Sequence, residues 1–254
     1  MNIDNLNKEM DSQNVIEIRE LNKAFGDNHV LRDYSLDLRK GETIAVLGRS
    51  GSGKSVLIKC IIGLMKPDTG SIHVLGNDVS ALSHWELDQL RVRMGFLFQS
   101  NALYDSMSVR DNLLFPMRRH GKEKSEEETN RIIRSALEAV ELPDTEHMMP
   151  AELSGGMKKR IALARTLILN PEIILYDEPT TGLDPITSKD ISNLIVDIQK
   201  KYNTSSLIIS HDLSSIKIVA DRIAVLLNGR CHAIGTYDEL ERSDDPEIRR
   251  FFDA

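Results

Sequence analysis

One short segment restricts the fold of this chain more than any other part of it. Residues 48–55 read GRSGSGKS, and they lie between an apolar run typical of a strand buried on both faces (43–48) and a helical pattern. Glycines let backbone N–H groups face phosphate oxygens, a helix start attracts anions, and Lys54 neutralises the β- and γ-oxygens of a nucleotide. We expect a phosphate-binding loop, a Gly/Ser-rich turn being the weaker alternative, with the Ser55 hydroxyl on Mg²⁺. Its nucleotide-binding residues are Gly48, Arg49, Ser50, Gly51, Ser52, Gly53, Lys54 and Ser55.

The hydrophobic pattern on either side of this loop predicts an α/β fold. Residues 15–41 alternate in polarity as antiparallel strands do, and Ser83 and Ser125 stand at capping-box spacing before helical patterns. From Pro171 onward short β-rich runs alternate with a helix. We therefore expect a mainly parallel sheet with helices on both faces, interrupted by a helical insertion near residues 99–165.

Composition excludes several classes of protein. The net charge of −7 argues against a nucleic-acid partner, and Cys60 and Cys231 lie far apart, so we expect buried thiols and neither a zinc site nor a disulfide. The polar first fourteen residues, which we expect to fray, lack a leader pattern, and no apolar run is long enough to span a membrane. We expect a cytosolic chain that does not itself cross a membrane.

Two later strands end in residues suited to the attack of water on a γ-phosphate. The run EIILYD delivers Asp177 to the edge of the sheet, where its carboxylate can bind Mg²⁺ through water, and Glu178 beside it can orient and deprotonate a water molecule. A simple turn before Pro179 is the alternative. The run SSLIIS ends before His211, whose default role is structural but which, near a nucleotide, becomes a sensor of the γ-phosphate.

A second anion site is predicted at residues 152–160, ELSGGMKKR. Ser154 is placed to cap a helix that begins with Gly155 and Gly156, so backbone N–H groups are again exposed at a positive helix end. One nucleotide carries one triphosphate, for which the first loop already provides a cradle. The second site therefore serves either another ligand or the same nucleotide from its opposite side.

These motifs, in this order and spacing, resemble the ATP-binding subunit of an ABC transporter over nearly the whole chain. The resemblance implies a P-loop NTPase with a RecA-like core, in which two subunits associate head to tail and sandwich two ATP molecules between the loop of one and the signature of the other. It also implies one domain, 1–254, with a β subdomain and core formed by 15–98 and 166–254 and a helical subdomain at 99–165.

The same resemblance assigns roles residue by residue. Gln99 matches the Q-loop residue, to which the family gives a catalytic and Mg²⁺-binding role. Phe25 matches the aromatic residue that stacks on adenine, and Asp184 matches the D-loop. It implies three sets of site residues: catalytic Glu178, His211, Lys54 and Gln99; nucleotide-binding Phe25, residues 48–55, Ser154, Gly155, Gly156 and Asp184; and metal-binding Ser55, Gln99 and Asp177.

Departures from the family pattern indicate a subfamily. The signature ends in Met157 where Gln is usual, and Phe25 replaces the commoner Tyr. Met157, the segment 97–120 and the late DPEIRRFFDA (245–254) are similar to the ATPases of MCE-type phospholipid transport systems, the Mla or Mkl group. Within 97–120, we expect six residues to line a groove for a permease helix: Leu103, Tyr104, Met107, Leu114, Phe115 and Met117. For each of them, packing within the helical subdomain is the alternative.

That subfamily implies an ATPase that powers phospholipid transport between the bacterial inner membrane and the outer envelope. It implies a homodimer on ATP binding, MlaE-like permease subunits, a lipid-binding MCE protein and a place on the cytoplasmic side of the inner membrane. A STAS-domain regulator is in doubt because the chain stops soon after Phe252. An amino-acid importer remains the alternative. Three other classes fit less well. DNA-repair ATPases of related architecture need a long coiled-coil insertion, for which the spacing between loop and signature leaves no room, and translation factors carry two cassettes where this chain has one. A non-enzymatic scaffold would not need Lys54, Glu178 and His211.

Overall fold

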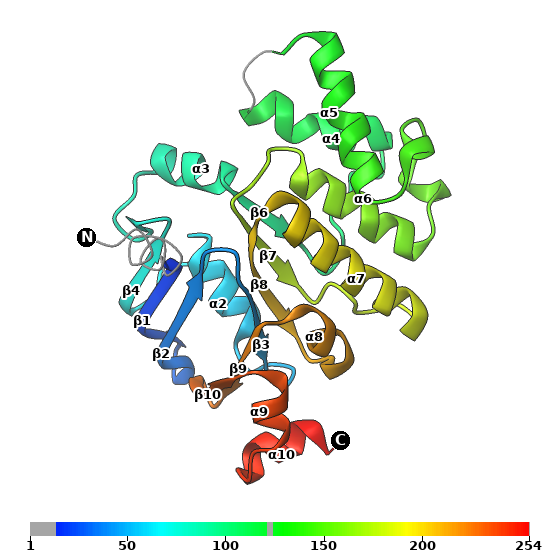
Figure 1. Cartoon of the computed structure of the whole chain (residues 1–254). Helices are drawn as coiled ribbons and strands as arrows, with labels where there is room; N and C mark the ends of the chain where they lie inside the picture. Colours follow the sequence, from blue (N-terminus) through cyan, green and yellow to red (C-terminus); the bar gives the residue numbers. More distant parts are fainter. Residues whose placement is uncertain (1–13, 121–123, 254) are drawn as a thin grey trace, which may run out of the picture.

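A computed structural model describes residues 14–120 and 124–253, so the polar stretch 1–13 lies outside the described residues. An antiparallel sheet lies near the N-terminus in the order β2-β1-β4-β5 (Figure 1). Its strands are β1 (Asn14–Phe25), β2 (Asn28–Arg39), β4 (Thr69–Val74) and β5 (Asn77–Asp78). The alternation predicted over 15–41 is thus confirmed as a pair of antiparallel strands.

A second sheet of six strands forms the centre of the molecule, in the order β10-β9-β3-β8-β7-β6. All neighbours are parallel except β10, which pairs with β9 in the antiparallel sense. The strands are β3 (Thr43–Leu47), β6 (Met94–Leu97), β7 (Ile173–Asp177), β8 (Ser205–Ser210), β9 (Arg222–Leu227) and β10 (Arg230–Gly235). The α/β fold with a mainly parallel sheet is therefore confirmed.

Helices cover both faces of this sheet, which explains the continuous apolar strands. Along β7, Ile173 and Leu175 belong to a core cluster shared with α2 (Lys54–Ile61). Ile174 and Tyr176 belong to a cluster on the opposite face, shared with α6 (Gly155–Leu167) and α7 (Pro185–Tyr202). A third cluster lies under the C-terminal helices. The remaining helices of this part are α3 (His84–Val92), α7 (Pro185–Tyr202), α8 (Leu213–Val219), α9 (Tyr237–Glu241) and α10 (Pro246–Phe252).

The segment between β6 and β7 is helical and projects to one side of the sheet (Figure 1). It contains α4 (Val109–His120), α5 (Glu126–Ala139), the short turns η1 (Pro143–Thr145) and η2 (Pro150–Glu152), and α6 (Gly155–Leu167). In the ranges 14–120 and 124–253, no helix is long and apolar enough to cross a membrane.

The expected groove along 97–120 requires a correction. Leu114 and Met117 are buried in the cluster beneath α6, because they share with Leu113 the face of α4 that packs inward at helical spacing. Tyr104 and Phe115 remain at the surface, with ring centroids 4.8 Å apart, and both border a shallow cavity beside β6. The groove is therefore made by fewer of these residues than the sequence suggested.

Candidate functional site

The phosphate loop connects β3, in the centre of the sheet, to the start of α2. Gly53 precedes the helix with φ 106°, and a Cβ there would lie 2.8 Å from Cγ1 of Val30, so both the backbone conformation and the space require glycine. The Lys54 ammonium donates to the backbone carbonyls of Gly48 at 2.7 Å and Arg49 at 3.1 Å. The loop therefore curls around its own lysine.

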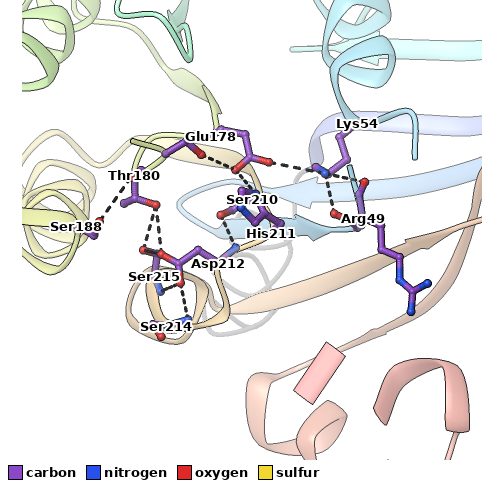
Figure 2. A network of polar contacts seen from close by, with 12 residues as sticks. Arg49, Lys54, Glu178, Thr180, Ser188, Ser210, His211, Asp212, Ser214 and Ser215 are labelled. Atoms are coloured by element: carbon purple, nitrogen blue, oxygen red, sulfur yellow. Dashed lines mark hydrogen bonds and ion pairs between the residues drawn. The ribbon is translucent and has the colours of Figure 1, made fainter. Parts of the chain in front are cut away.

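Lys54 and Glu178 face each other across the site (Figure 2). The ammonium lies 3.7 Å from Oε1 of Glu178, and both side chains are buried. Burial lowers the pKa of Lys54, while the charges of Glu178 and Asp177 oppose that shift. The pair keeps each charge partly compensated in an environment where an unpaired charge is costly.

Glu178 follows β7 directly, with a left-handed backbone at φ 51°. Its Oε2 atom is 2.9 Å from Nδ1 of His211 and accepts a hydrogen bond of 3.1 Å from the hydroxyl of Thr181. His211 comes directly after β8, the strand beside β7, and its side chain is 61 % exposed. The parallel strands thus bring the expected base and the expected sensor to one edge of the sheet, whereas Thr181 was not foreseen from the sequence.

Asp177 ends β7 on the side of the phosphate loop. Its pKa is raised, chiefly by burial and then by the charge of Glu178, and its Oδ1 atom is buried with no hydrogen-bond partner among the described residues. A buried, unpaired carboxylate oxygen is what a hard cation would satisfy. Asp177 and the Ser55 hydroxyl therefore fit Mg²⁺, although no cluster of three or more His, Cys, Asp or Glu side chains occurs within the described ranges.

A cavity of about 900 Å³ unites most of the predicted nucleotide residues. It is open on one side, and its volume suits a ligand of nucleotide size. Residues named from the sequence that line it are Gly48, Arg49, Ser50, Gly51, Gly53, Lys54, Ser55, Gln99, Glu178 and His211. Four others that sequence reasoning missed also line it, namely Val30, Val56, Arg250 and Phe251.

The remaining predicted residues lie elsewhere on the molecule. Ser154 caps α6 by accepting from the Met157 amide at 3.2 Å, as predicted, and it is exposed and not among the residues that line the cavity. Phe25 is 49 % exposed at the end of β1, with the Lys23 ammonium 5.6 Å from its ring centroid. Asp184 caps α7. One chain therefore keeps its two anion-binding helix starts apart.

Helix α6 is tied to the Gln99 segment by two cations. Lys159, only 2 % exposed, donates to the backbone carbonyl of Gln99 at 2.9 Å, and Arg165 donates to the carbonyls of Ala102 at 2.8 Å and Asn101 at 3.1 Å. In the sequence these residues look like ordinary solvated charges. Only the packing of α6 against β6 shows that they hold the segment after that strand.

A hydrogen-bonded network joins the segment after β8 to the start of α7 (Figure 2). Asp212 caps α8 and accepts from the Ser215 hydroxyl at 2.6 Å, and Ser215 in turn lies 3.3 Å from the Thr180 hydroxyl. Hydrogen bonds from Ser215 and the neighbouring amides lower the pKa of Asp212 despite its burial. The network fixes the segments on either side of His211 and Glu178.

The fold and the cavity together define a nucleoside triphosphatase of the phosphate-loop class. A central strand ends in the loop, a carboxylate faces the lysine of that loop, and a histidine from the neighbouring strand contacts the carboxylate. Comparison with known proteins identifies the family, because the family model described as ABC transporter matches residues 31–181. The chain belongs to the ABC transporter ATPases.

Individual relatives agree with this assignment. The chain is 41 % identical over 239 residues to a protein of Mycobacterium leprae named as a probable ribonucleotide transport ATP-binding protein, mkl, covering 94 % of this chain and 69 % of the relative. It is 39 % identical to the intermembrane phospholipid transport system ATP-binding protein MlaF of Haemophilus influenzae, covering 94 % and 90 %. Among solved structures, the dimeric ATP-binding cassette MJ0796 bound to ADP and Pi matches with a TM-score of 0.79 and 28 % identity, over 87 % of this chain and 98 % of that one.

Proposed function

We propose that this chain hydrolyses ATP to power phospholipid transport between the inner membrane and the outer envelope of a bacterium, as the ATPase of an MCE-type system. The ATPase part is supported by one observation above all, the convergence of Lys54, Glu178 and His211 on the cavity of the phosphate loop. The cargo is supported by 39 % identity to a phospholipid transport ATPase over 90 % of that relative's length.

The chemistry follows from the positions of these side chains. The amides of the loop and the Lys54 ammonium hold the phosphate chain, and Glu178 orients the attacking water and takes its proton. His211, on the other side of Oε2, donates to the γ-phosphate as negative charge spreads over its oxygens. Mg²⁺ would be held by Ser55, Asp177 and Gln99, and when bound it offsets charge on the β- and γ-oxygens.

The two predicted anion sites are separate in one chain, and this separation supports a working unit of two chains. Ser154, Gly155 and Gly156 stand at the exposed start of α6, away from the cavity that holds Lys54. In a head-to-tail dimer, the signature of one chain faces the loop of the other, so ATP binds the closed dimer better than the separate chains and shifts the population towards it. Phe25 then stacks on adenine, and Asp184 lies at the contact between the chains.

The wider assembly is proposed from the same relationship. Tyr104 and Phe115, at the surface beside β6, would contact a permease in the membrane. In that assembly the chain would lie on the cytoplasmic face of the inner membrane. A lipid-binding MCE protein would complete the complex. Co-purification of the tagged chain from membranes, with mass spectrometry of proteins and lipids, tests the cargo, since an amino-acid permease in place of an MCE protein would overturn it.

Two variants test the ATPase assignment. Glu178→Gln keeps the shape of the side chain but cannot take a proton, so we expect hydrolysis to fall about 10²–10⁴-fold while an ATP-bound dimer accumulates on a sizing column. Lys54→Ala should lose nucleotide binding. A fully active Glu178→Gln chain that stays monomeric would contradict the scheme, and near-normal ATP affinity in Lys54→Ala would contradict the assignment of the loop.

A further inference from the structure

The C-terminal helix borders the same cavity as the phosphate loop, although about two hundred residues separate them in the chain. Arg250 and Phe251, both on α10, line the cavity together with Arg49 and the rest of the loop. None of the roles assigned above uses these two residues. Their position raises the question of what α10 does beside a nucleotide.

Helix α10 is held against the strand that delivers the loop. Ile248 is buried in the core cluster that also contains Ala45 and Leu47 of β3. At its start, Asp245 caps the helix by accepting from the Glu247 amide at 2.8 Å, and its other oxygen lies 2.7 Å from Nε2 of His232. The helix therefore has a defined place relative to the phosphate loop.

Phe251 contacts Arg49, the first residue of the loop that carries a side chain. The Arg49 guanidinium lies 5.9 Å from the Phe251 ring centroid, within the range of a cation–π contact. Figure 2 shows the Arg49 side chain pointing away from Lys54, towards the C-terminal segment. Phe251 thus contacts the outer side of the loop through Arg49, whose carbonyl accepts from Lys54 on the inner side.

Arg250 adds a positive charge to the rim of the cavity. Its side chain is 58 % exposed and pairs with Glu247 at 2.6 Å, one turn earlier on the helix. Exposed pairs of this kind contribute little free energy, so an arginine can exchange such a partner for phosphate oxygens, which its planar guanidinium binds well. With Lys54 and Arg49, three cations then border the cavity.

We propose that α10 is part of the nucleotide-binding site, with Arg250 contacting the phosphate chain and Phe251 positioning the phosphate loop through Arg49. The inference rests on the proposed function, because it takes the cavity to be the ATP site. It adds a binding residue and a positioning residue from a part of the chain where no nucleotide motif was recognised.

The test uses the full chain and the non-hydrolysable ATP analogue AMP-PNP with Mg²⁺, titrated by calorimetry. Arg250→Ala removes the charge, and Phe251→Leu removes the ring face while keeping an apolar side chain for packing. The helix supplies a matched control for each. Arg249 is not among the residues that line the cavity; it lies 3.9 Å from Asp244 and donates to the Ser243 carbonyl at 3.2 Å, so Arg249→Ala removes a charge and a helix contact outside the site. Phe252→Leu removes a ring that packs on Tyr237. Arg250→Lys separates charge from geometry.

We expect Arg250→Ala and Phe251→Leu each to raise the Kd about threefold to tenfold, the range of exposed cation–π and charge-assisted contacts. Arg250→Lys should lie between Arg250→Ala and the parent chain, and both controls should stay within about twofold of the parent. Equal affinities for each variant and its control would overturn the inference.

An equal loss in Arg250→Ala, Phe251→Leu and both control variants would also overturn it, since α10 would then act only by packing. Lys54→Ala distinguishes a failure of the inference about α10 from a failure of the proposed function. If that variant loses nucleotide binding while Arg250→Ala and Phe251→Leu keep it, only the inference about α10 fails. If Lys54→Ala keeps its affinity, the cavity is not the nucleotide site and the proposed function fails with it.

Discussion

The hydrogen bond from Thr181 to Glu178 offers a sharp test of how the proposed base is positioned. The Thr181 hydroxyl donates to Oε2 at 3.1 Å, and the same oxygen lies 2.9 Å from His211. Replacing Thr181 by valine keeps the branched shape and removes the donor. Oε2 would then keep only its contact with a histidine whose side chain is 61 % exposed, so the carboxylate would be freer to turn.

The size of the effect follows from the kind of bond that is lost. A hydrogen bond to a charged group is worth about 1.5–3 kcal/mol, and the partial exposure of Thr181 favours the lower end of that range. If this energy is needed to hold the base in line, a loss of about 1.4 kcal/mol lowers kcat about tenfold. The KM for ATP should change little, because Thr181 is not among the residues that line the nucleotide cavity.

Steady-state ATPase measurements on the purified full chain give kcat and KM separately. Thr181→Ser is the matched control, since it restores the hydroxyl, and its kcat should return to within about twofold to threefold of the parent. Thermal unfolding checks that neither variant is destabilised. Wild-type kcat in a well-folded Thr181→Val chain would refute the reasoning, and so would an equal loss in Thr181→Ser, which would point to shape and not to the hydrogen bond.

Three further predictions concern other parts of the chain. Cys60 is buried but Cys231 is only partly buried, so the expectation of two buried thiols is correct for Cys60 and wrong for Cys231. Burial raises the pKa of each thiol to about 11, so alkylation at pH 8 should be slower in the folded chain than after unfolding. The stability that these raised pKa values contribute, complete below about pH 9, should be lost as the pH rises towards 11. Lys159→Met leaves the Gln99 carbonyl without its donor, so hydrogen exchange at 98–102 should quicken; unchanged exchange would contradict the tether. Ser83→Ala removes a capping box and should cost about 1 kcal/mol in urea unfolding.

Much of the fold could be predicted because the relevant signals are local. The unbroken apolar run of β3 follows from burial on both faces, since Ile44 and Val46 pack on one side and Ala45 and Leu47 on the other. Capping chemistry was equally readable at Ser83, where both hydrogen bonds of the box are present. At Ser125, the serine side chain accepts from the Glu128 amide, but the reciprocal hydrogen bond of a capping box is not formed between these two described residues. The spacing therefore predicted the helix cap correctly but not the complete capping box.

The parts that could not be predicted depend on contacts between distant segments. Whether Leu114 and Met117 face a groove or the core is decided by the packing of α6 on α4, which the pattern of one helix does not fix. The approach of Phe251 to Arg49 depends on how the C-terminal segment returns to β3. No spacing rule connects residues so far apart, so such neighbours of a motif become visible only in the folded chain.

The burial of Lys159 has a physical consequence for communication within the chain. Burial lowers the pKa of its ammonium group. One hydrogen bond to a backbone carbonyl offsets little of the free energy needed to remove a charge from water, so Lys159 contributes little to the stability of α6. Lys159 instead positions the Gln99 segment, because Lys159 and Arg165 together attach that segment to α6, the helix that Ser154 caps. Because α6 is a single helix, its first turn is joined to the Gln99 segment through Lys159 and Arg165. Whatever shifts the start of α6 must therefore shift the Gln99 segment, without any additional element between the two sites.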